Sequence, residues 1–219
     1  MNRIVFPARC VLFDWDGTLL NSFAADTRAY LTMFRTLEIE WGPEQLKSHY
    51  SPDWYRVYRA ACVPRSQWRR ADRLWRTAYA AGKPRLLPGA QNVVRILGRK
   101  FVLGLVTSGS RSRVRRQLRE FGLAKYFSAC VYSEDANRKK PHPEALKWAM
   151  KCLDACSEDC VYVGDSAEDI EMARRAGVRP IGVLGPFPTA ARMRAARPDL
   201  LLRSIRELPR YLRPAGSRS

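Results

Sequence analysis

The feature that most constrains the fold is an alternation of short apolar runs with helical stretches in the second half of the chain. The apolar runs lie at residues 101–106, 129–132, 160–163 and 180–183. Helical patterns lie near 88–98, 110–121, 141–153 and 166–176. Strands that alternate with helices predict a parallel sheet with helices on both of its faces. The fold class is therefore α/β.

An earlier apolar run, Val11–Phe13, is separated from these by a long segment with helical signals and almost no strand signal. Within it, Tyr30, Phe34 and Leu37 are spaced for one helix face. We expect the run at 11–13 to join the same sheet. The sequence then predicts a Rossmann-like core of residues 1–21 and 86–219, with an all-helical domain of residues 22–85 inserted into it.

Two acids follow the first apolar run, in the sequence V-L-F-D-W-D-G-T. Side chains alternate along a strand, so Asp14 and Asp16 should point to one side, with Trp15 opposite. Like charges this close repel each other unless a cation or a division of labour separates them. The pair indicates a metal site or an acid/base pair, and a solvated Asp-x-Asp-Gly turn is the open alternative.

Polar residues also follow other strands, where ligands gather in open α/β sheets. Thr107, Ser108 and Gly109 precede a helix N-terminus and could hold an anion. Lys140 lies just before Pro141, which should open a helix. Asp165 ends a strand and Asp169 follows one helical turn later. Each alone fits a helix cap or a solvated side chain, but together they predict magnesium-assisted phosphoryl transfer.

The net charge, the apolar stretches and the cysteines of the chain limit the classes of partner and the cellular location that we expect. The formal net charge of +18 favours anionic partners, either nucleic acid or a phosphorylated metabolite, although an arginine-rich solvated surface explains most basic residues. No apolar stretch approaches a membrane span, and the N-terminus lacks the unbroken apolar core of a signal peptide, so we expect a cytoplasmic protein. The series Cys152, Cys156 and Cys160 could suggest a metal cluster, but we interpret these cysteines as reduced structural thiols.

Four motifs, in order, give the chain a family resemblance. They are D-W-D-G-T at 14–18, T-S-G at 107–109, K-P-H-P at 140–143 and G-D-S-A-E-D at 164–169. They resemble the motifs of haloacid dehalogenase (HAD) superfamily phosphatases of the phosphoglycolate phosphatase-like group. The fixed residues of the first motif should arise by chance in only about one chain in a thousand of this length. The helical segment corresponds to the inserted cap of that family.

The resemblance implies a role for each matching residue. Asp14 would be the nucleophile that forms an aspartyl phosphate, and Asp16 the acid and then the base. Mg²⁺ would be bound by the carboxylates of Asp14 and Asp165 and the main-chain carbonyl of Asp16, with Asp169 acting directly or through water. Thr107, Ser108, Gly109 and Lys140 would hold the phosphoryl group. The presence of Asp16 argues against a dehalogenase, since halide departure needs no proton.

The resemblance leaves the substrate open. We expect a small phosphomonoester, with 2-phosphoglycolate as the best guess, hydrolysed by a monomer or homodimer. A phosphosugar mutase of the β-phosphoglucomutase type is one alternative. A phosphatase directed at nucleotides or nucleic acid, or a nucleic-acid binder that kept the core, is another. In the cap, which should close over the core, His49 and Arg56 are candidates for substrate contact, although His49 could equally be a merely exposed residue.

Overall fold

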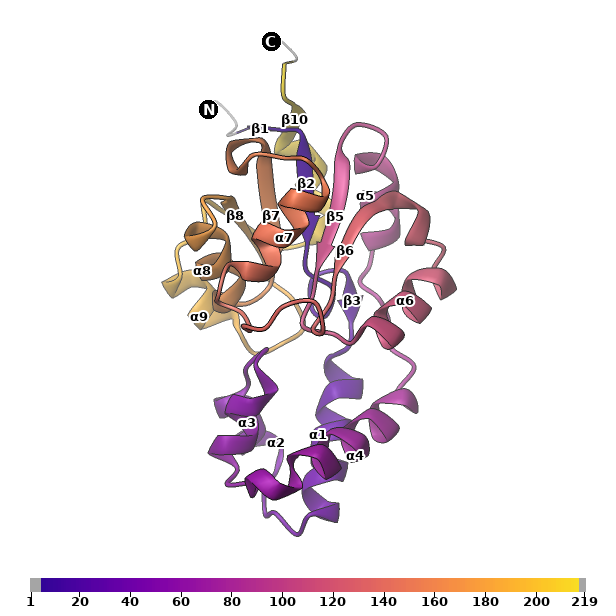
Figure 1. The fold of residues 1–219 in the computed structure, drawn as a ribbon, viewed down its shortest axis with the longest axis vertical. Helices are drawn as coiled ribbons and strands as arrows, with labels where there is room; N and C mark the ends of the chain where they lie inside the picture. The colour runs from indigo at the N-terminus through magenta and orange to yellow at the C-terminus, as the bar shows by residue number, and fades with distance from the viewer. Residues whose placement is uncertain (1–4, 217–219) are drawn as a thin grey trace. The chain divides into compact units, whose positions relative to one another are not determined.

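The chain forms two compact units, each with its own apolar core. The computed structural model describes residues 5–216. One unit contains the described residues up to Leu20 and those from Leu86 onward, and the other is Asn21–Arg85. The chain passes between them through β3 (Leu20–Asn21) and β4 (Arg85–Leu86), two short strands that pair with each other (Figure 1).

The first unit is built on a six-stranded sheet in the order β6-β5-β2-β7-β8-β9, in which every pairing is parallel. The strands are β2 (Cys10–Phe13), β5 (Val102–Val106), β6 (Phe127–Val131), β7 (Cys160–Gly164), β8 (Arg179–Val183) and β9 (Leu200–Leu202). The early strand β2 lies between β5 and β7, so the prediction that it joins the later strands is confirmed. The α/β fold class is confirmed with it.

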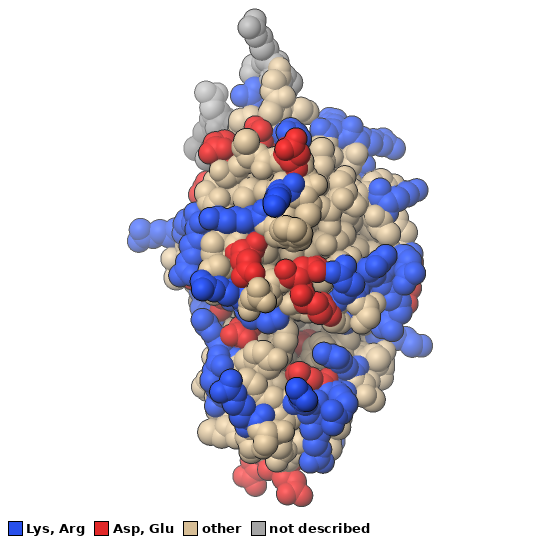
Figure 2. Space-filling model, in the orientation of Figure 1, with Lys and Arg blue, Asp and Glu red and all other residues tan. Residues whose placement is uncertain are grey.

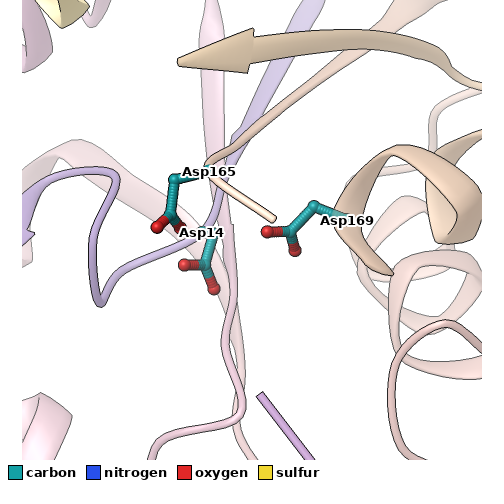
Figure 3. A group of neighbouring side chains, drawn as sticks. All are labelled: Asp14, Asp165 and Asp169. Carbon is teal, nitrogen blue, oxygen red and sulfur yellow. The ribbon is translucent and has the colours of Figure 1, made fainter. Parts of the chain in front are cut away.

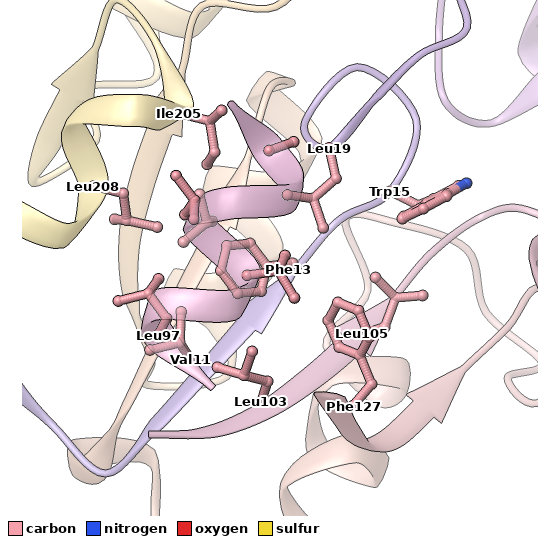
Figure 4. Packing of buried hydrophobic residues seen from close by; sticks show 14 of the residues in the cluster. Val11, Phe13, Trp15, Leu19, Leu97, Leu103, Leu105, Phe127, Ile205 and Leu208 are labelled. Carbon is pink, nitrogen blue, oxygen red and sulfur yellow. The ribbon is translucent and has the colours of Figure 1, made fainter. Parts of the chain in front are cut away.

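Helices cover both faces of this sheet because side chains alternate along each strand. Val11 and Phe13 pack with α5 (Ala90–Leu97), α6 (Arg111–Glu120) and the 3₁₀ helix η4 (Ile205–Arg210), as Figure 4 shows. Leu12 points to the other face, which α7 (Glu144–Cys152) and α8 (Ala167–Arg175) cover. Fully burying one such side chain contributes roughly 1.5–3 kcal/mol. The central strand is thereby fixed from both sides, and its carboxyl end is held in place.

The remaining elements of this unit are shorter. They are β1 (Phe6–Ala8) and β10 (Leu212–Pro214), which pair in parallel, α9 (Ala190–Ala195), η2 (Ala124–Tyr126) and η3 (Ser157–Asp159). Within residues 5–216, no helix has both the length and the apolar character needed to cross a membrane.

The second unit is helical, with its own core. Its elements are α1 (Phe23–Thr36), α2 (Pro43–His49), α3 (Trp54–Ala60), η1 (Arg65–Gln67) and α4 (Trp68–Ala80). Tyr30 and Phe34 are buried in its core, as their helical spacing predicts. Helix α2 begins at Pro43, because proline fits the first turn of a helix and Gln45 caps the main-chain N–H of Gly42.

One predicted boundary is wrong. Helix α7 begins at Glu144, three residues after Pro141. The carboxylate of Glu144 accepts hydrogen bonds from the main-chain N–H groups of Asn137 and Arg138. These contacts fold residues 137–143 into a loop that ends at the helix, so Lys140 lies on that loop rather than at the helix start.

Candidate active site

Three buried carboxylates meet at the carboxyl ends of neighbouring strands. Asp14 directly follows β2, Asp165 directly follows β7, and Asp169 lies in the first turn of α8. Each offers an oxygen within 4.8 Å of the others, and Figure 3 shows their side chains converging. Because β2 and β7 are parallel neighbours, their carboxyl ends share one edge of the sheet. The structure thus brings together three of the acids singled out by sequence.

Lys140 supplies the one ammonium group bonded to this cluster among residues 5–216. Its Nζ donates to Asp14 Oδ1 at 2.6 Å and to Asp169 Oδ1 at 2.8 Å. It also lies 2.9 Å from the hydroxyl oxygen of Tyr162, a residue of β7. The side chain of Lys140 is only 5% exposed, so these contacts replace its hydration shell. One positive charge therefore faces three carboxylates.

The hydrogen bonds of Asp169 define its part in the cluster. Its Oδ1 accepts from Lys140 and lies 3.2 Å from the hydroxyl of Tyr162. Its Oδ2 accepts from both the main-chain N–H and the hydroxyl of Ser166, in the capping box of α8. Four lone-pair sites are the capacity of a carboxylate. In this structure Asp169 orients Lys140 and caps a helix.

Burial shapes the charges of the cluster. Burial raises the pKa of Asp14 to about 7, and repulsion from Asp169 adds to this while Lys140 opposes it. Burial, followed by the charges of Asp14 and Asp169, holds the pKa of Asp165 well above its usual range. Burial alone would lower the pKa of Lys140, but its neighbours Asp14 and Asp169 raise it well above the ordinary value. The group therefore has an excess of negative charge.

These residues fit a small divalent cation. Carboxylate oxygens are hard ligands of the kind that Mg²⁺ prefers, and an additional positive charge would offset the repulsion that raises the acids' pKa values. The backbone at Gly17 also leaves space for the carboxylate of Asp165. Gly17 has φ +86°, and a Cβ there would lie 2.1 Å from Asp165 Oδ2. Thr18 donates its hydroxyl to Asp165 Oδ1 at 3.2 Å, which fixes that carboxylate.

The residues expected to bind an anion lie between β5 and α6. Thr107 is buried, and its Oγ1 accepts a hydrogen bond from the main-chain N–H of Gly109 at 3.0 Å. A hydroxyl that accepts this bond keeps its own proton available for donation. Ser108 lies between them on the turn. Their predicted role in holding a phosphoryl group stays a prediction.

Asp16 has a different partner from the other acids. Its carboxylate accepts two hydrogen bonds from Arg113 of α6, from Nη1 to Oδ1 at 2.9 Å and from Nη2 to Oδ2 at 2.6 Å. Its side chain is 24% exposed. Trp15, between the two acids, is buried in the apolar cluster that α6 also lines. Because Asp16 bonds to the same helix, the structure does not confirm the prediction that Asp14 and Asp16 share one side with Trp15 opposite. Asp14 and Asp16 are therefore close in sequence but are held by different cations.

The other candidates lie away from this cluster or in the helical unit. His49, at the end of α2, is exposed and lies against Trp41, with ring centroids 5.1 Å apart. Arg56, on α3, is 54% exposed and lies 3.8 Å from Asp53 Oδ2. Cys152 and Cys156 are exposed free thiols and Cys160 is buried, and none belongs to the acidic group that could hold a metal ion among the described residues.

Sequence reasoning missed Tyr162 and Arg113. Tyr162 lies within an apolar strand, where its hydroxyl also donates to the main-chain carbonyl of Val106 at 3.0 Å. The only signal for it was a polar tip on a strand that ends in an acid. Arg113 lies among the arginines of R-S-R-V-R-R, where residue type alone singles out none of them.

A buried carboxylate beside a buried lysine, in an acidic group that could hold a metal ion at the ends of parallel strands, is an arrangement compatible with phosphoryl transfer in an α/β enzyme. The comparisons with known proteins specify the family. The family model "Haloacid dehalogenase-like hydrolase" matches residues 11–183, and the chain belongs to that family.

Relatives agree with this assignment. The chain is 30% identical to the pyrophosphatase PpaX of Halalkalibacterium halodurans over 90% of this chain and 94% of that protein. It is 32% identical to the phosphoglycolate phosphatase of Escherichia coli over 48% of this chain and 42% of that protein. A putative phosphoglycolate phosphatase from Lactobacillus plantarum has the same fold, with TM-score 0.84 at 18% identity, covering 94% of this chain and 100% of that one. The chain is thus a hydrolase of the phosphatase type.

Proposed function

We propose that the protein is a Mg²⁺-dependent phosphatase that hydrolyses small phosphate esters or anhydrides through an aspartyl phosphate on Asp14. The observation that carries this proposal is the placement of Asp14. Its carboxylate is buried at the end of the central strand, bonded to Lys140 and close to Asp165. A nucleophile held in this way has a fixed orientation toward the phosphorus that it attacks.

The first half-reaction transfers the phosphoryl group to the enzyme. The Asp14 carboxylate attacks phosphorus, the bond from phosphorus to the leaving oxygen breaks, and Asp16 gives its proton to that oxygen. Lys140 and the Thr107 hydroxyl would hold the transferring oxygens, and their burial supports this proposal. Lys140 also reduces the repulsion between Asp14 and an approaching phosphate.

The second half-reaction hydrolyses the aspartyl phosphate and regenerates the free enzyme. Asp16, now ionised, takes a proton from water, the resulting hydroxide attacks phosphorus, and the bond to Asp14 breaks. Asp14, Asp165 and the main-chain carbonyl of Asp16 would hold Mg²⁺, which when bound neutralises charge on the phosphoryl oxygens. Asp169, whose oxygens accept hydrogen bonds from Lys140 and Ser166, would keep Lys140 in position and would act on the metal directly or through water.

Two substrates are favoured. The first is 2-phosphoglycolate, the prediction from the motifs, which is supported by the likeness to the Escherichia coli enzyme. The second is pyrophosphate, supported by the PpaX relative, which matches over 90% of this chain. Both carry a second anionic group beside the scissile bond. His49 and Arg56 remain our candidates for recognising that group, and variants at either should change discrimination among substrates more than turnover of a minimal ester.

The decisive experiment measures turnover of phosphoglycolate, pyrophosphate, hexose phosphates and nucleotides with Mg²⁺ and with a chelator. We expect Asp14→Asn to remove turnover of every substrate while the fold is retained by circular dichroism. Phosphorylation of wild-type protein by substrate, trapped by rapid acid quench, should be absent in this variant. Retained turnover in Asp14→Asn would refute the nucleophile assignment, and isomer formation from a hexose phosphate would replace hydrolysis with a mutase reaction.

A further inference from the structure

The reaction proposed above gives no role to Arg113, although this residue bonds to the Asp16 carboxylate. We propose that Arg113 is a positioning residue that orients the Asp16 carboxylate for proton transfer. This inference rests on the proposed function, because it concerns how the acid and base of that reaction is held. It assigns a role in the reaction to helix α6, which lies on one face of the sheet.

The geometry of the pair is the first argument. Two parallel N–H···O bonds, at 2.9 and 2.6 Å, join the two ends of the guanidinium to the two oxygens of the carboxylate. Such a fork fixes the plane of a carboxylate as well as its position, which a single ammonium contact does not. The Arg113 side chain is only 13% exposed, so the pair is screened less than a surface ion pair.

The surroundings of Arg113 are the second argument. Gln117, one helical turn later, accepts a hydrogen bond from Trp15 Nε1 at 2.9 Å through its Oε1, and Arg113 Nη1 lies 3.4 Å from the same atom. Arg113 and Gln117 therefore hold two successive residues, Asp16 and Trp15. The segment that follows Asp14 is attached to α6 by side chains at both positions.

The turn before α6 leaves room for this arrangement. A Cβ at Gly109 would lie 2.4 Å from Arg113 Nη2 and 2.7 Å from Val114 Cγ2. Neither contact could persist at these distances, so a larger residue at Gly109 would shift the guanidinium or the Val114 side chain. Glycine at position 109 therefore leaves space for the Arg113 side chain, in addition to any contact of its main-chain N–H with an anion.

The test compares esters that differ in their need for a proton. An alkyl phosphate has a poor leaving group, whereas an aryl phosphate with an acidic phenol leaves without protonation. We expect Arg113→Gln to lower kcat/KM for the alkyl ester by about tenfold or more, within the range of general acid catalysis, and to change kcat/KM for the aryl ester little. Arg113→Lys, which keeps the charge without the fork, should fall between wild type and Arg113→Gln.

A double-mutant cycle assigns the effect to Asp16. In an Asp16→Asn background, Arg113→Gln should cause no further loss on either ester, because there is no carboxylate left to orient. The matched control is Arg116→Gln on the same helix, whose side chain is 56% exposed and faces Glu120. We expect wild-type kinetics from it.

Equal losses on both esters, or additive losses in the cycle, would overturn the proposal and make Arg113 a structural or phosphate-binding residue. Wild-type kinetics in Arg113→Gln would overturn it as well. If Arg113→Gln does not fold, the comparison of Arg113→Lys with wild type on the two esters decides in the same way. Failure of the proposed function is a separate result, because it would appear as turnover retained by Asp14→Asn.

Discussion

At the scale of single residues, Asp14, the proposed nucleophile, is buried in an environment that disfavours its charged form. Burial raises its pKa from 3.8 to about 7. Between these values the folded protein binds more protons than the unfolded chain, so the free energy of unfolding falls as pH rises. We therefore predict that metal-free protein loses stability from about pH 4 to about pH 7 through this group. Urea unfolding midpoints measured across that range in a chelator test the slope.

Mg²⁺ and a neutral variant are the controls for this slope. A cation at the carboxylates favours their ionised forms, so saturating Mg²⁺ should flatten the decline and raise stability most near neutral pH. Asp14→Asn removes one titrating group and should make the slope shallower in the chelator, while Asp165, whose pKa is also raised, keeps part of it. A decline that is as steep in Asp14→Asn as in wild type would show that other groups cause it.

The sequence predicted the residues that meet at Asp14 but missed one that holds Asp16, for a physical reason. Topology brings Asp14 and Asp165 together, because each follows a strand of the same sheet. Lys140 enters the site from a loop and was recognised by its motif. Arg113 is one of five arginines between residues 111 and 119. Which of these arginines faces Asp16 depends on the rotation of α6 about its axis and on the space beside Gly109. Only the folded structure shows both.

At the scale of elements, α6 is fixed by apolar and polar contacts together. Val114 and Leu118 are buried in the core, while Gln117 binds the indole N–H of Trp15 in a buried position. Gln117→Leu would leave that donor unsatisfied, which costs about 1–3 kcal/mol. We predict a fall of several degrees in Tm, measured by thermal denaturation. Gln91→Leu on α5, where the side chain is exposed, is the matched control and should change little.

The elements themselves were largely predictable, and the failure at α7 has a local cause. The central strands and α5, α6 and α8 lie where apolar runs and helical spacing predicted them. The start of α7 was predicted too early because side-chain contacts in the preceding loop decide it. The Glu144 carboxylate binds the main-chain N–H of Asn137. Such contacts depend on loop geometry that residue periodicity does not contain.

At the scale of the whole molecule, the net charge of +18 could act in two ways. It could attract small anionic substrates over a long range, or it could form a local binding surface for a polyanion. Figure 2 shows Lys and Arg spread over the visible face rather than gathered into one stripe. A dispersed field attracts small anions from a distance but offers no aligned track for a nucleic-acid backbone. On that face, the distribution of charge therefore favours attraction of a small anion over alignment of a polynucleotide.

Salt dependence distinguishes these two effects. The Debye length shrinks from roughly 10 Å at 0.1 M salt to roughly 3 Å at 1 M, so attraction between the protein and a small anion is screened over this range. We predict that kcat/KM for an anionic ester falls several-fold between these concentrations while kcat stays nearly constant. Duplex DNA should not inhibit turnover at roughly 0.15 M salt, because dispersed charges contact few phosphates at once and so release few counterions. Inhibition by DNA that persists at that concentration and falls steeply with added salt would instead indicate a localised polyanion site.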